Sequence, residues 1–196
     1  MKYFICVIVG LIIHAFVVYP VLLVIFTRLN PIKFFRRFFS VMFFAFSSST
    51  SNATIPLNME KLSEMGVSRE MSSFTIPLGA TINMDGTAIM QGCAIMFAAQ
   101  AYGIDLGLSA LLTVIFTAVM ASIGTAGVPS VGLITLNMVF NSVGLPTDAI
   151  AMIMGIDHIL DMFRTAVNIT GDAICTLIVS FKNNALNLDK YNGKSI

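Results

Sequence analysis

The sequence predicts an all-α membrane protein that crosses the bilayer several times. Hydrophobic residues make up 57% of its 196 residues and charged residues only 11%, and the mean hydropathy is +0.89. Two segments carry no formal charge, residues 3–26 and residues 106–147. The first is long enough for one membrane-spanning helix, and the second is long enough for two helical limbs. A soluble domain of this size could not bury so much apolar surface.

Apolar runs and helix-breaking residues divide the chain into five membrane elements and a tail. In chain order they are a span at 3–26, a two-limbed hairpin at 31–63, a broken span at 70–101, a second hairpin at 108–142, a span at 148–181 and a polar cytoplasmic tail at 182–196. The order of hairpin, helix, hairpin and helix predicts an inverted repeat, which in transporters places the binding site between the two halves.

Each hairpin turns at small and hydroxyl-bearing residues that include a proline, at 47–56 and at 122–130. These tips are poor helix formers, yet each lies between apolar limbs. Non-helical backbone survives at membrane depth only where protein buries it or water reaches it. We therefore interpret both elements as re-entrant hairpins. The alternative is that each limb is a full span and that an ordinary loop joins the two.

The distribution of positive charge predicts the orientation of these elements. Basic residues follow the first span, the first hairpin and the last span: Arg28, Lys33, Arg36, Arg37, Lys61, Arg69, Lys182, Lys190 and Lys194. The connections around Asp105 and Asp148 contain none. Because cytoplasmic loops carry the excess of Lys and Arg, we expect the C-terminus and the first hairpin on the cytoplasmic side. The second hairpin then enters from outside, and Met1 lies outside as well.

The last span carries a polar stripe. Its members are spaced four, three, four and four residues apart: Asp157, Asp161, Arg164, Asn168 and Asp172. At about 100° per residue they share one face of a helix, within an arc of about 80°. Ionisable groups inside a membrane are costly and by default mark a substrate, ion or proton path. The alternative is an internal network in which Arg164 neutralises Asp157 and Asp161 and only holds helices together.

The broken span is interrupted at the string NMDGT, residues 83–87. Asp85 is the only charged residue between residues 75 and 104, and Gly86 beside it lowers helix propensity. An unwound turn would free carbonyl oxygens next to this carboxylate, which suits a hard monovalent cation. A kinked helix with a satisfied Asp85 is the alternative.

Four ordered motifs together resemble one family. NMDGT at 83–87, ASIGTAGVP at 121–129, DMFRTAVNITGD at 161–172 and the serine-rich first tip are similar to the dicarboxylate/amino acid:cation symporters, the glutamate transporter family. The resemblance covers nearly the whole chain. It implies an elevator-type secondary carrier, not an enzyme, that couples sodium or proton influx to substrate uptake. It also implies a multi-pass protein of the plasma membrane that forms homotrimers, needs no cofactor besides the coupling ions and binds no nucleic acid.

The resemblance implies seven substrate-binding residues: Ser51, Thr87, Val128, Asp161, Arg164, Thr165 and Asn168. Asp161 would bind the α-amino group of the substrate and Asn168 its α-carboxylate. Arg164, with Thr87 beside it, would bind a side-chain carboxylate, because a guanidinium fork can donate two parallel hydrogen bonds.

The resemblance also implies three sodium sites. They are Asp172 with the backbone of Gly79, Asn83 and Asn168; the backbone around Thr81 with the second tip at Ser122, Ile123 and Thr125; and Asn83 with Asp85. Gln91 stands where animal glutamate carriers have a glutamate that is linked to proton and potassium coupling, so we expect no potassium countertransport.

The resemblance also narrows the class of substrate through two residues of the stripe. Family members for C4-dicarboxylates lack the aspartate at Asp161, and members for small neutral amino acids typically lack the arginine at Arg164. Keeping both favours glutamate or aspartate, with cystine or a C4-dicarboxylate as alternatives. Some members carry an arginine at the position of Ser49 and others at that of Met162, and this chain has neither. The resemblance also implies that the second tip acts as the outer gate of the site. Ser130 replaces the glycine that is common after the proline of this tip, so we expect the flexibility of the gate to differ.

Length is the largest departure from the family, whose members have further helical segments before this region. We therefore expect a truncated chain with an incomplete transport domain that does not transport alone. Two functions of other classes remain open. One is a non-transporting fragment or partner subunit, and a remote one is an intramembrane aspartyl protease that uses Asp85 and a stripe aspartate.

The remaining reactive side chains are expected to have packing roles only. Cys6, Cys93 and Cys175 are dispersed in apolar segments without metal-ligand spacing, and we interpret them as buried thiols, not disulfides or ligands. His14 and His158 lie on apolar helices and are expected to pack there.

Overall fold

The computed structural model describes residues 1–123 and 127–193, and the regular elements within these ranges are all helical. In order they are α1 (Lys2–Ile13), η1 (His14–Val18), α2 (Tyr19–Thr27), α3 (Pro31–Ser48), α4 (Ser51–Glu64), α5 (Arg69–Ile82), α6 (Asp85–Ala101), α7 (Leu108–Ser122), α8 (Val131–Ser142), η2 (Thr147–Ile150), α9 (Ala151–Lys182) and α10 (Leu188–Tyr191). The predicted all-α class is confirmed.

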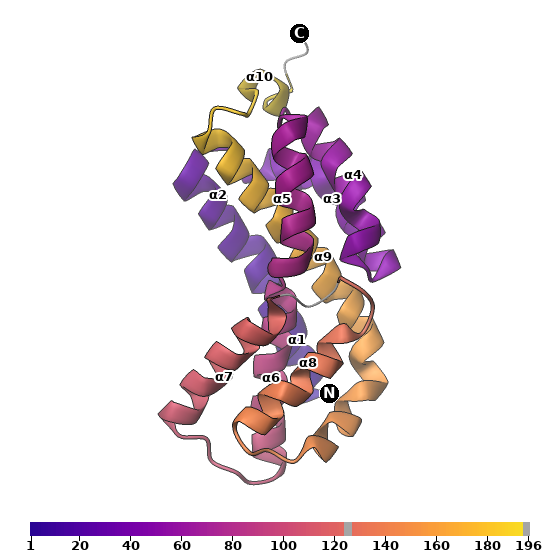
Figure 1. The fold of residues 1–196 in the computed structure, drawn as a ribbon, viewed down its shortest axis with the longest axis vertical. Coiled ribbons are helices and arrows are strands. Elements are labelled where there is room, and N and C mark those ends of the chain that lie inside the picture. The colour runs from indigo at the N-terminus through magenta and orange to yellow at the C-terminus, as the bar shows by residue number, and fades with distance from the viewer. Residues whose placement is uncertain (124–126, 194–196) are drawn as a thin grey trace.

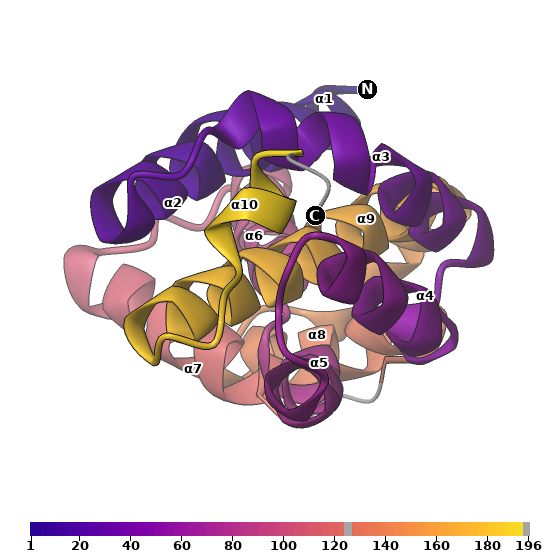
Figure 2. The same cartoon turned by 90° about the horizontal axis from the view of Figure 1, so that it is seen from above.

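Two helices in the described ranges are long and apolar enough to cross a membrane, Lys2–Thr27 and Thr147–Lys182. The first is continuous through α1, η1 and α2, and η1 is a π-helical turn that begins at His14. It ends at Arg28, which adopts the left-handed conformation with φ of 57°. The second lies in the middle of the molecule. Figure 2 shows α9 between α1, α2 and α3 on one side and α5, α7 and α8 on the other.

Two helical hairpins approach the middle of the molecule from opposite ends (Figure 1). The first is α3 and α4, in which the Asn30 side chain caps α3 by accepting a hydrogen bond from the Ile32 amide. The second is α7 and α8. The tips meet where the Thr50 hydroxyl donates to the Gly127 carbonyl over 2.6 Å, and the Asn52 amide donates to the same oxygen over 3.3 Å. The two hairpins therefore contact each other at their tips, in the middle of the molecule.

The chain leaves helical geometry between α5 and α6. Asn83 and Met84 have backbone angles outside the helical region, with ψ of 86° and 46°. The Asn83 amide still donates to the Gly79 carbonyl, and the Met84 carbonyl accepts from Ala88, so the break is confined to these two residues. This places Asp85 at the start of a helix in the middle of the molecule.

Residues after α9 pack against the α3 to α5 end and are not a free tail. A short antiparallel bridge pairs Val67 with Leu186. Tyr191 of α10 is buried, and its hydroxyl donates to the carbonyl of Asn30 over 3.0 Å. Arg37 donates to the backbone carbonyls of α10 as well. The contacts tie the end of the chain to the start of the first hairpin.

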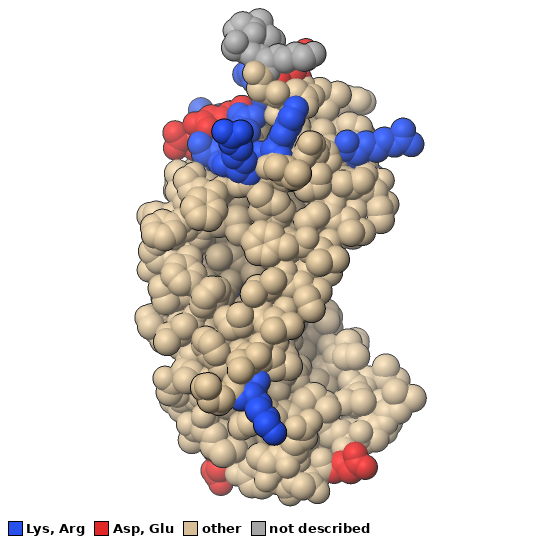
Figure 3. All heavy atoms as spheres, turned by 180° about the vertical axis from the view of Figure 1, so that it is seen from behind, with Lys and Arg blue, Asp and Glu red and all other residues tan. Residues whose placement is uncertain are grey.

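On the face that Figure 3 shows, the wide middle of the molecule carries no charged side chains, and the charges lie towards the two ends. Most of the visible Lys and Arg atoms gather at the end where α10 lies. Many large apolar side chains are exposed, including Phe16, Phe39 and Phe116, which are 58%, 65% and 68% exposed. Exposed phenylalanines along several helices are what a lipid-facing surface requires. The structure is thus consistent with a membrane protein.

The expectation that the cysteines and histidines are simply packed is wrong in part. Cys6 and Cys175 are exposed and not buried. His158 is also exposed, on the face of α9 opposite the buried stripe. His14 is half-buried but makes a polar contact, which is described below.

Candidate functional site

The two tips, the broken span and α9 enclose a small cavity. It holds about 10 Å³ of accessible volume, room for about one water. Its lining is Ser49, Ser51, Met84, Thr87, Gly127, Val128, Val131, Gly132, Asp161, Thr165 and Asn168. Six of the seven residues that the resemblance assigns to substrate therefore line one cavity. This volume is too small for an amino acid.

The seventh residue, Arg164, lies next to this cavity and is 1% exposed. Its Nη2 donates to Asp161 Oδ1 over 2.6 Å and its Nη1 donates to Asp157 Oδ1 over 2.9 Å. All three residues are on α9, so these ion pairs join no two helices. Arg164 Nε is buried and has no hydrogen-bond partner among the described residues. The network thus matches the expected pairing but leaves one guanidinium donor unsatisfied, and such a donor is costly.

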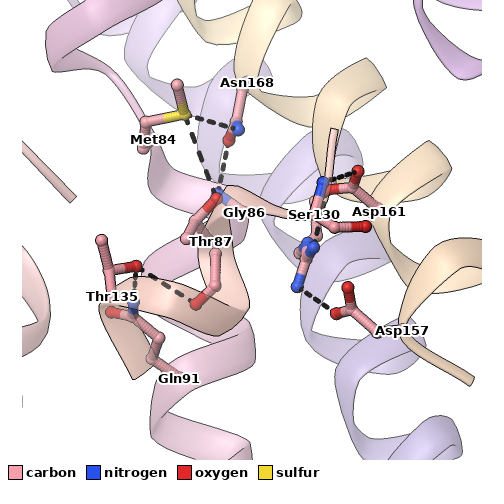
Figure 4. Close-up of polar contacts among 11 residues, drawn as sticks. Met84, Gly86, Thr87, Gln91, Ser130, Thr135, Asp157, Asp161 and Asn168 are labelled. Carbon is pink, nitrogen blue, oxygen red and sulfur yellow. Dashed lines mark hydrogen bonds and ion pairs between the residues drawn. The ribbon is translucent and has the colours of Figure 1, made fainter. Parts of the chain in front are cut away.

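Asp161 and Asn168 of the stripe also connect α9 to neighbouring elements (Figure 4). Asp161 Oδ2 accepts a hydrogen bond of 2.8 Å from the Ser130 amide, at the start of α8. Asn168 Oδ1 accepts one of 2.7 Å from the Gly86 amide, and Asn168 Nδ2 lies 3.2 Å from the sulfur of Met84. The stripe therefore contacts both the second hairpin and the break.

Two glycines allow this close packing. A Cβ on Gly86 would lie 2.9 Å from the backbone oxygen of Arg164, a distance that real Cβ atoms essentially never show. A Cβ on Gly132 would lie 3.2 Å from the Thr87 methyl and 3.4 Å from Arg164 Nη1. Thr87 and Arg164 therefore both lie close to Gly132 on α8. These are the two residues to which the resemblance assigns the side-chain carboxylate of the substrate.

The first predicted sodium site is brought together around Asp172. Asn83 Nδ2 donates to Asp172 Oδ1 over 2.9 Å and to the Asn168 carbonyl over 3.1 Å. A Cβ on Gly79 would lie only 2.6 Å from Asp172 Oδ1, so the α5 backbone passes directly by this carboxylate. Asp172 Oδ2 is buried without a hydrogen-bond partner among the described residues. A buried carboxylate with a free oxygen fits a cation.

Near the second predicted sodium site, the second tip approaches the backbone of α5, because a Cβ on Gly127 would lie 3.2 Å from the Ala80 carbonyl oxygen. Thr81 is exposed and its hydroxyl donates to Leu78 of its own helix. Ser122 is buried and donates to Val119 of its own helix, while Ile123 is exposed. Thr125 lies outside the described residues.

The third predicted sodium site is divided. Asn83 contacts the Asp172 site, whereas Asp85 Oδ2 lies 3.1 Å from His14 Nε2 and accepts a hydrogen bond of 3.0 Å from the Tyr19 hydroxyl. The sequence did not predict that His14 and Tyr19 contact Asp85. It predicted the pairing of Asp157 with Arg164 only under the alternative of an internal network that holds helices together. The spacing of His14 and Tyr19 in an apolar run carries no signal of the contact, because Asp85 is 71 residues beyond His14.

The chain is similar to several excitatory amino acid transporters. The chain is 42% identical over 197 residues to excitatory amino acid transporter 1 of Rattus norvegicus, covering 99% of this chain and 36% of that protein. It is 41% identical over 179 residues to excitatory amino acid transporter 5 of Mus musculus, covering 91% and 32%. An excitatory amino acid transporter of Caenorhabditis elegans is 41% identical over 178 residues, covering 90% and 35%.

The chain spans about a third of the length of these curated relatives. The family model of the sodium:dicarboxylate symporters matches residues 1–181, almost the whole chain. With a match of this extent, the protein belongs to the sodium:dicarboxylate symporter family.

Proposed function

We propose that this chain forms the substrate-binding part of a secondary carrier that couples sodium influx to uptake of an acidic amino acid, glutamate or aspartate. The observation that carries the proposal is the cavity between the tips, with Asp161 and the buried Arg164 side by side. One carboxylate and one guanidinium at this distance match the ammonium and the side-chain carboxylate of such a substrate. The family and its relatives are transporters and not enzymes.

Substrate binding would exchange the partners of an existing ion pair. Arg164 Nη2 now donates to Asp161 Oδ1, and Arg164 Nε is unsatisfied. A substrate carboxylate could accept from both donors, and Asp161 would then be free for the substrate ammonium. The exchange replaces one buried ion pair by two, so neither protein charge is left without a counter-charge. A C4-dicarboxylate lacks the ammonium and would leave Asp161 unpaired.

Sodium would compensate the charge of Asp172. This carboxylate is 2% exposed, accepts one hydrogen bond from Asn83 and has a free oxygen. Asn168 links it to the substrate cavity, because the Asn168 carbonyl accepts from Asn83 while its side chain lies in the cavity lining. A ligand at either place stabilises the same packing around Asn168, which is the thermodynamic basis for coupling.

The contact between tips provides a barrier over the site. The Thr50 hydroxyl and the Asn52 amide both donate to the Gly127 carbonyl, and Ser51 and Gly127 line the cavity. Opening requires that these two hydrogen bonds break. We include in the proposal that the hairpins are re-entrant, since short limbs meeting in the interior need protein or water around their tips.

Orientation and assembly belong to the same proposal. The basic end of the molecule would face the cytoplasm, with the C-terminus, in agreement with the excess of Lys and Arg on that side. The membrane would be the plasma membrane. The longer protein would be a homotrimer, as the family resemblance implies.

Ligand binding tests this proposal with the chain itself and with a chimera in which it replaces the matching third of rat excitatory amino acid transporter 1. We expect sodium-dependent binding of radiolabelled aspartate that unlabelled glutamate displaces better than cystine or succinate. Better displacement by cystine or succinate would assign the alternative substrates. Binding by neither protein at any sodium concentration would contradict the proposal and favour a non-transporting partner subunit.

A further inference from the structure

Helices α1 and α6 pack along a seam in constant antiparallel register. The side-chain pairs along it, from one end to the other, are Tyr3 with Phe97, Cys6 with Cys93, Gly10 with Ile89 and His14 with Asp85. Steps of three or four residues on the first helix are matched by steps of four on the second, which is one helical turn each time. The register thus brings two cysteines, 87 residues apart, to the same level.

The two sulfur atoms of this seam lie 3.5 Å apart. Close helix packing produces the approach, since a Cβ on Gly10 would already lie 2.9 Å from the Ile89 side chain one turn away. A disulfide needs a sulfur separation of about 2.05 Å, so the atoms must close by about 1.5 Å. Side-chain rotation can supply much of this movement, and the register needs no change.

The pair is also accessible. Cys6 is exposed and Cys93 is half-buried, so a small reagent can reach at least one sulfur without unfolding the chain. Cys175 lies elsewhere, on α9, and is exposed too. It therefore serves as a single thiol of similar accessibility for comparison.

We propose that Cys6 and Cys93 form a dithiol modification site that closes to a reversible intramolecular disulfide between α1 and α6. The inference is independent of the proposed transport function. It differs from the sequence-based expectation that the three cysteines are buried thiols and form no disulfide.

The reaction needs a two-electron oxidant of the diazene class. One thiolate adds across the N=N bond, and the second thiolate then attacks that sulfur and expels the nitrogen group. The S–S bond forms as the S–N bond breaks, the two sulfurs lose two electrons, and the diazene becomes a hydrazine after taking up two protons. A dithiol reductant reverses the cross-link by thiol exchange.

The cross-link would fix the seam near the Asp85 contact. Cys6 precedes His14 by about two helical turns, roughly 12 Å along the axis. With α1 tied to α6 at Cys93, the register that brings His14 to Asp85 would be held. Oxidation is thus expected to rigidify this helix pair without changing its arrangement.

Counting free thiols tests the proposal with the 196-residue chain in detergent micelles. The chain is treated with diamide, denatured, and labelled with a maleimide–polyethylene glycol that adds a fixed mass to each thiol. Without oxidation we expect three labels per chain, one for each cysteine. After diamide we expect one label, on Cys175, and an intact chain lighter by two hydrogens. Dithiothreitol should restore all three labels.

Matched variants identify the pair. Cys6→Ser and Cys93→Ser should each keep two labels after diamide, whereas Cys175→Ser should fall from two labels to none. Three labels on the unmodified chain, under conditions that oxidise dithiothreitol in a parallel sample, would overturn the proposal. So would a loss of labels that persists in Cys6→Ser, or a cross-linked species of twice the chain mass in place of the internal disulfide.

Discussion

Arg164 and Asp161 form an ion pair of 2.6 Å one helical turn apart on α9, although each is expected to bind an opposite end of the same substrate. The pair is buried, and Asp157 satisfies a second donor of the same guanidinium. The opposite charges of the site are therefore paired with one another. Under the proposed function, substrate binding would exchange these partners, and this exchange would favour a molecule that carries both charges.

Replacing Arg164 by lysine tests the two-pronged contact. A lysine keeps the charge but donates from a single point, so one charge-assisted hydrogen bond is lost. A bond to a charged group contributes about 1.5–3 kcal/mol, which corresponds to about a 10- to 100-fold weaker affinity for aspartate. Competition binding on the chimera measures it. An unchanged aspartate affinity would show that Arg164 does not grip the carboxylate.

Replacing Asp157 by asparagine is expected to destabilise the protein. The variant leaves the buried Arg164 with Asp161 as its only charged partner among the described residues. Loss of one hydrogen bond between charged groups typically costs about 1.5–3 kcal/mol. Thermal unfolding in detergent measures the effect, and Asp148→Asn on the exposed surface is the matched control. Equal melting temperatures for the two variants would mean that the ion pair contributes nothing.

The Asp172→Asn change is expected to weaken sodium binding and leave the fold intact. The asparagine side chain fills the same volume and can still accept from Asn83, but it carries no charge for a cation. We expect the sodium concentration for half-maximal aspartate binding to rise by about tenfold or more, as for loss of about 1.4 kcal/mol. Asp105→Asn, on an exposed connection, controls for net charge. An unchanged sodium dependence would show that the coupling cation does not bind at Asp172.

Gln91 predicts uptake that does not depend on internal potassium. Its amide donates to the Thr135 hydroxyl over 2.8 Å and the residue is fully buried, so this position holds a neutral side chain between α6 and α8. Aspartate uptake by the chimera should therefore be equal with potassium or choline inside the vesicles. Strict dependence on internal potassium would refute this prediction.

Docking of the chain end is expected to weaken at high pH. Burial raises the pKa of the Tyr191 phenol, with the nearby Arg37 opposing the shift. Since the pKa of Tyr191 in the folded protein lies above the ordinary value of about 10, the contribution of its neutral phenol to stability is complete below about pH 10. This contribution is lost as the pH rises through the raised pKa. Proteolysis near α10 should accelerate in that range. In Tyr191→Phe the pH dependence should disappear, at a cost of about 1 kcal/mol for the hydrogen bond to Asn30.

The features that sequence predicted well are local ones. The spacing of Asp157 through Asp172 repeats with the helix period, so one buried face follows from the chain alone. Likewise, the string NMDGT contains the place where helical geometry stops, at Asn83 and Met84. Both signals lie within a few residues.

What sequence could not predict depends on packing between distant segments. The contact of His14 with Asp85 and the approach of Cys6 to Cys93 both require the register of α1 against α6. An uninterrupted apolar helix offers many equivalent registers, and its sequence does not choose among them. Tyr191 contacts Asn30 because the chain turns back after α9. The polar composition of the residues after α9 does not predict this turn.

Sodium-gradient-driven uptake of radiolabelled aspartate tests the central claim most directly. The chimera is reconstituted in proteoliposomes, and uptake is compared with an inward sodium gradient, with equal sodium on both sides and with choline. We predict concentrative uptake only with the gradient, abolished by Arg164→Cys. Uptake that ignores sodium, or that persists in the Arg164→Cys variant with unchanged affinity, would contradict the account.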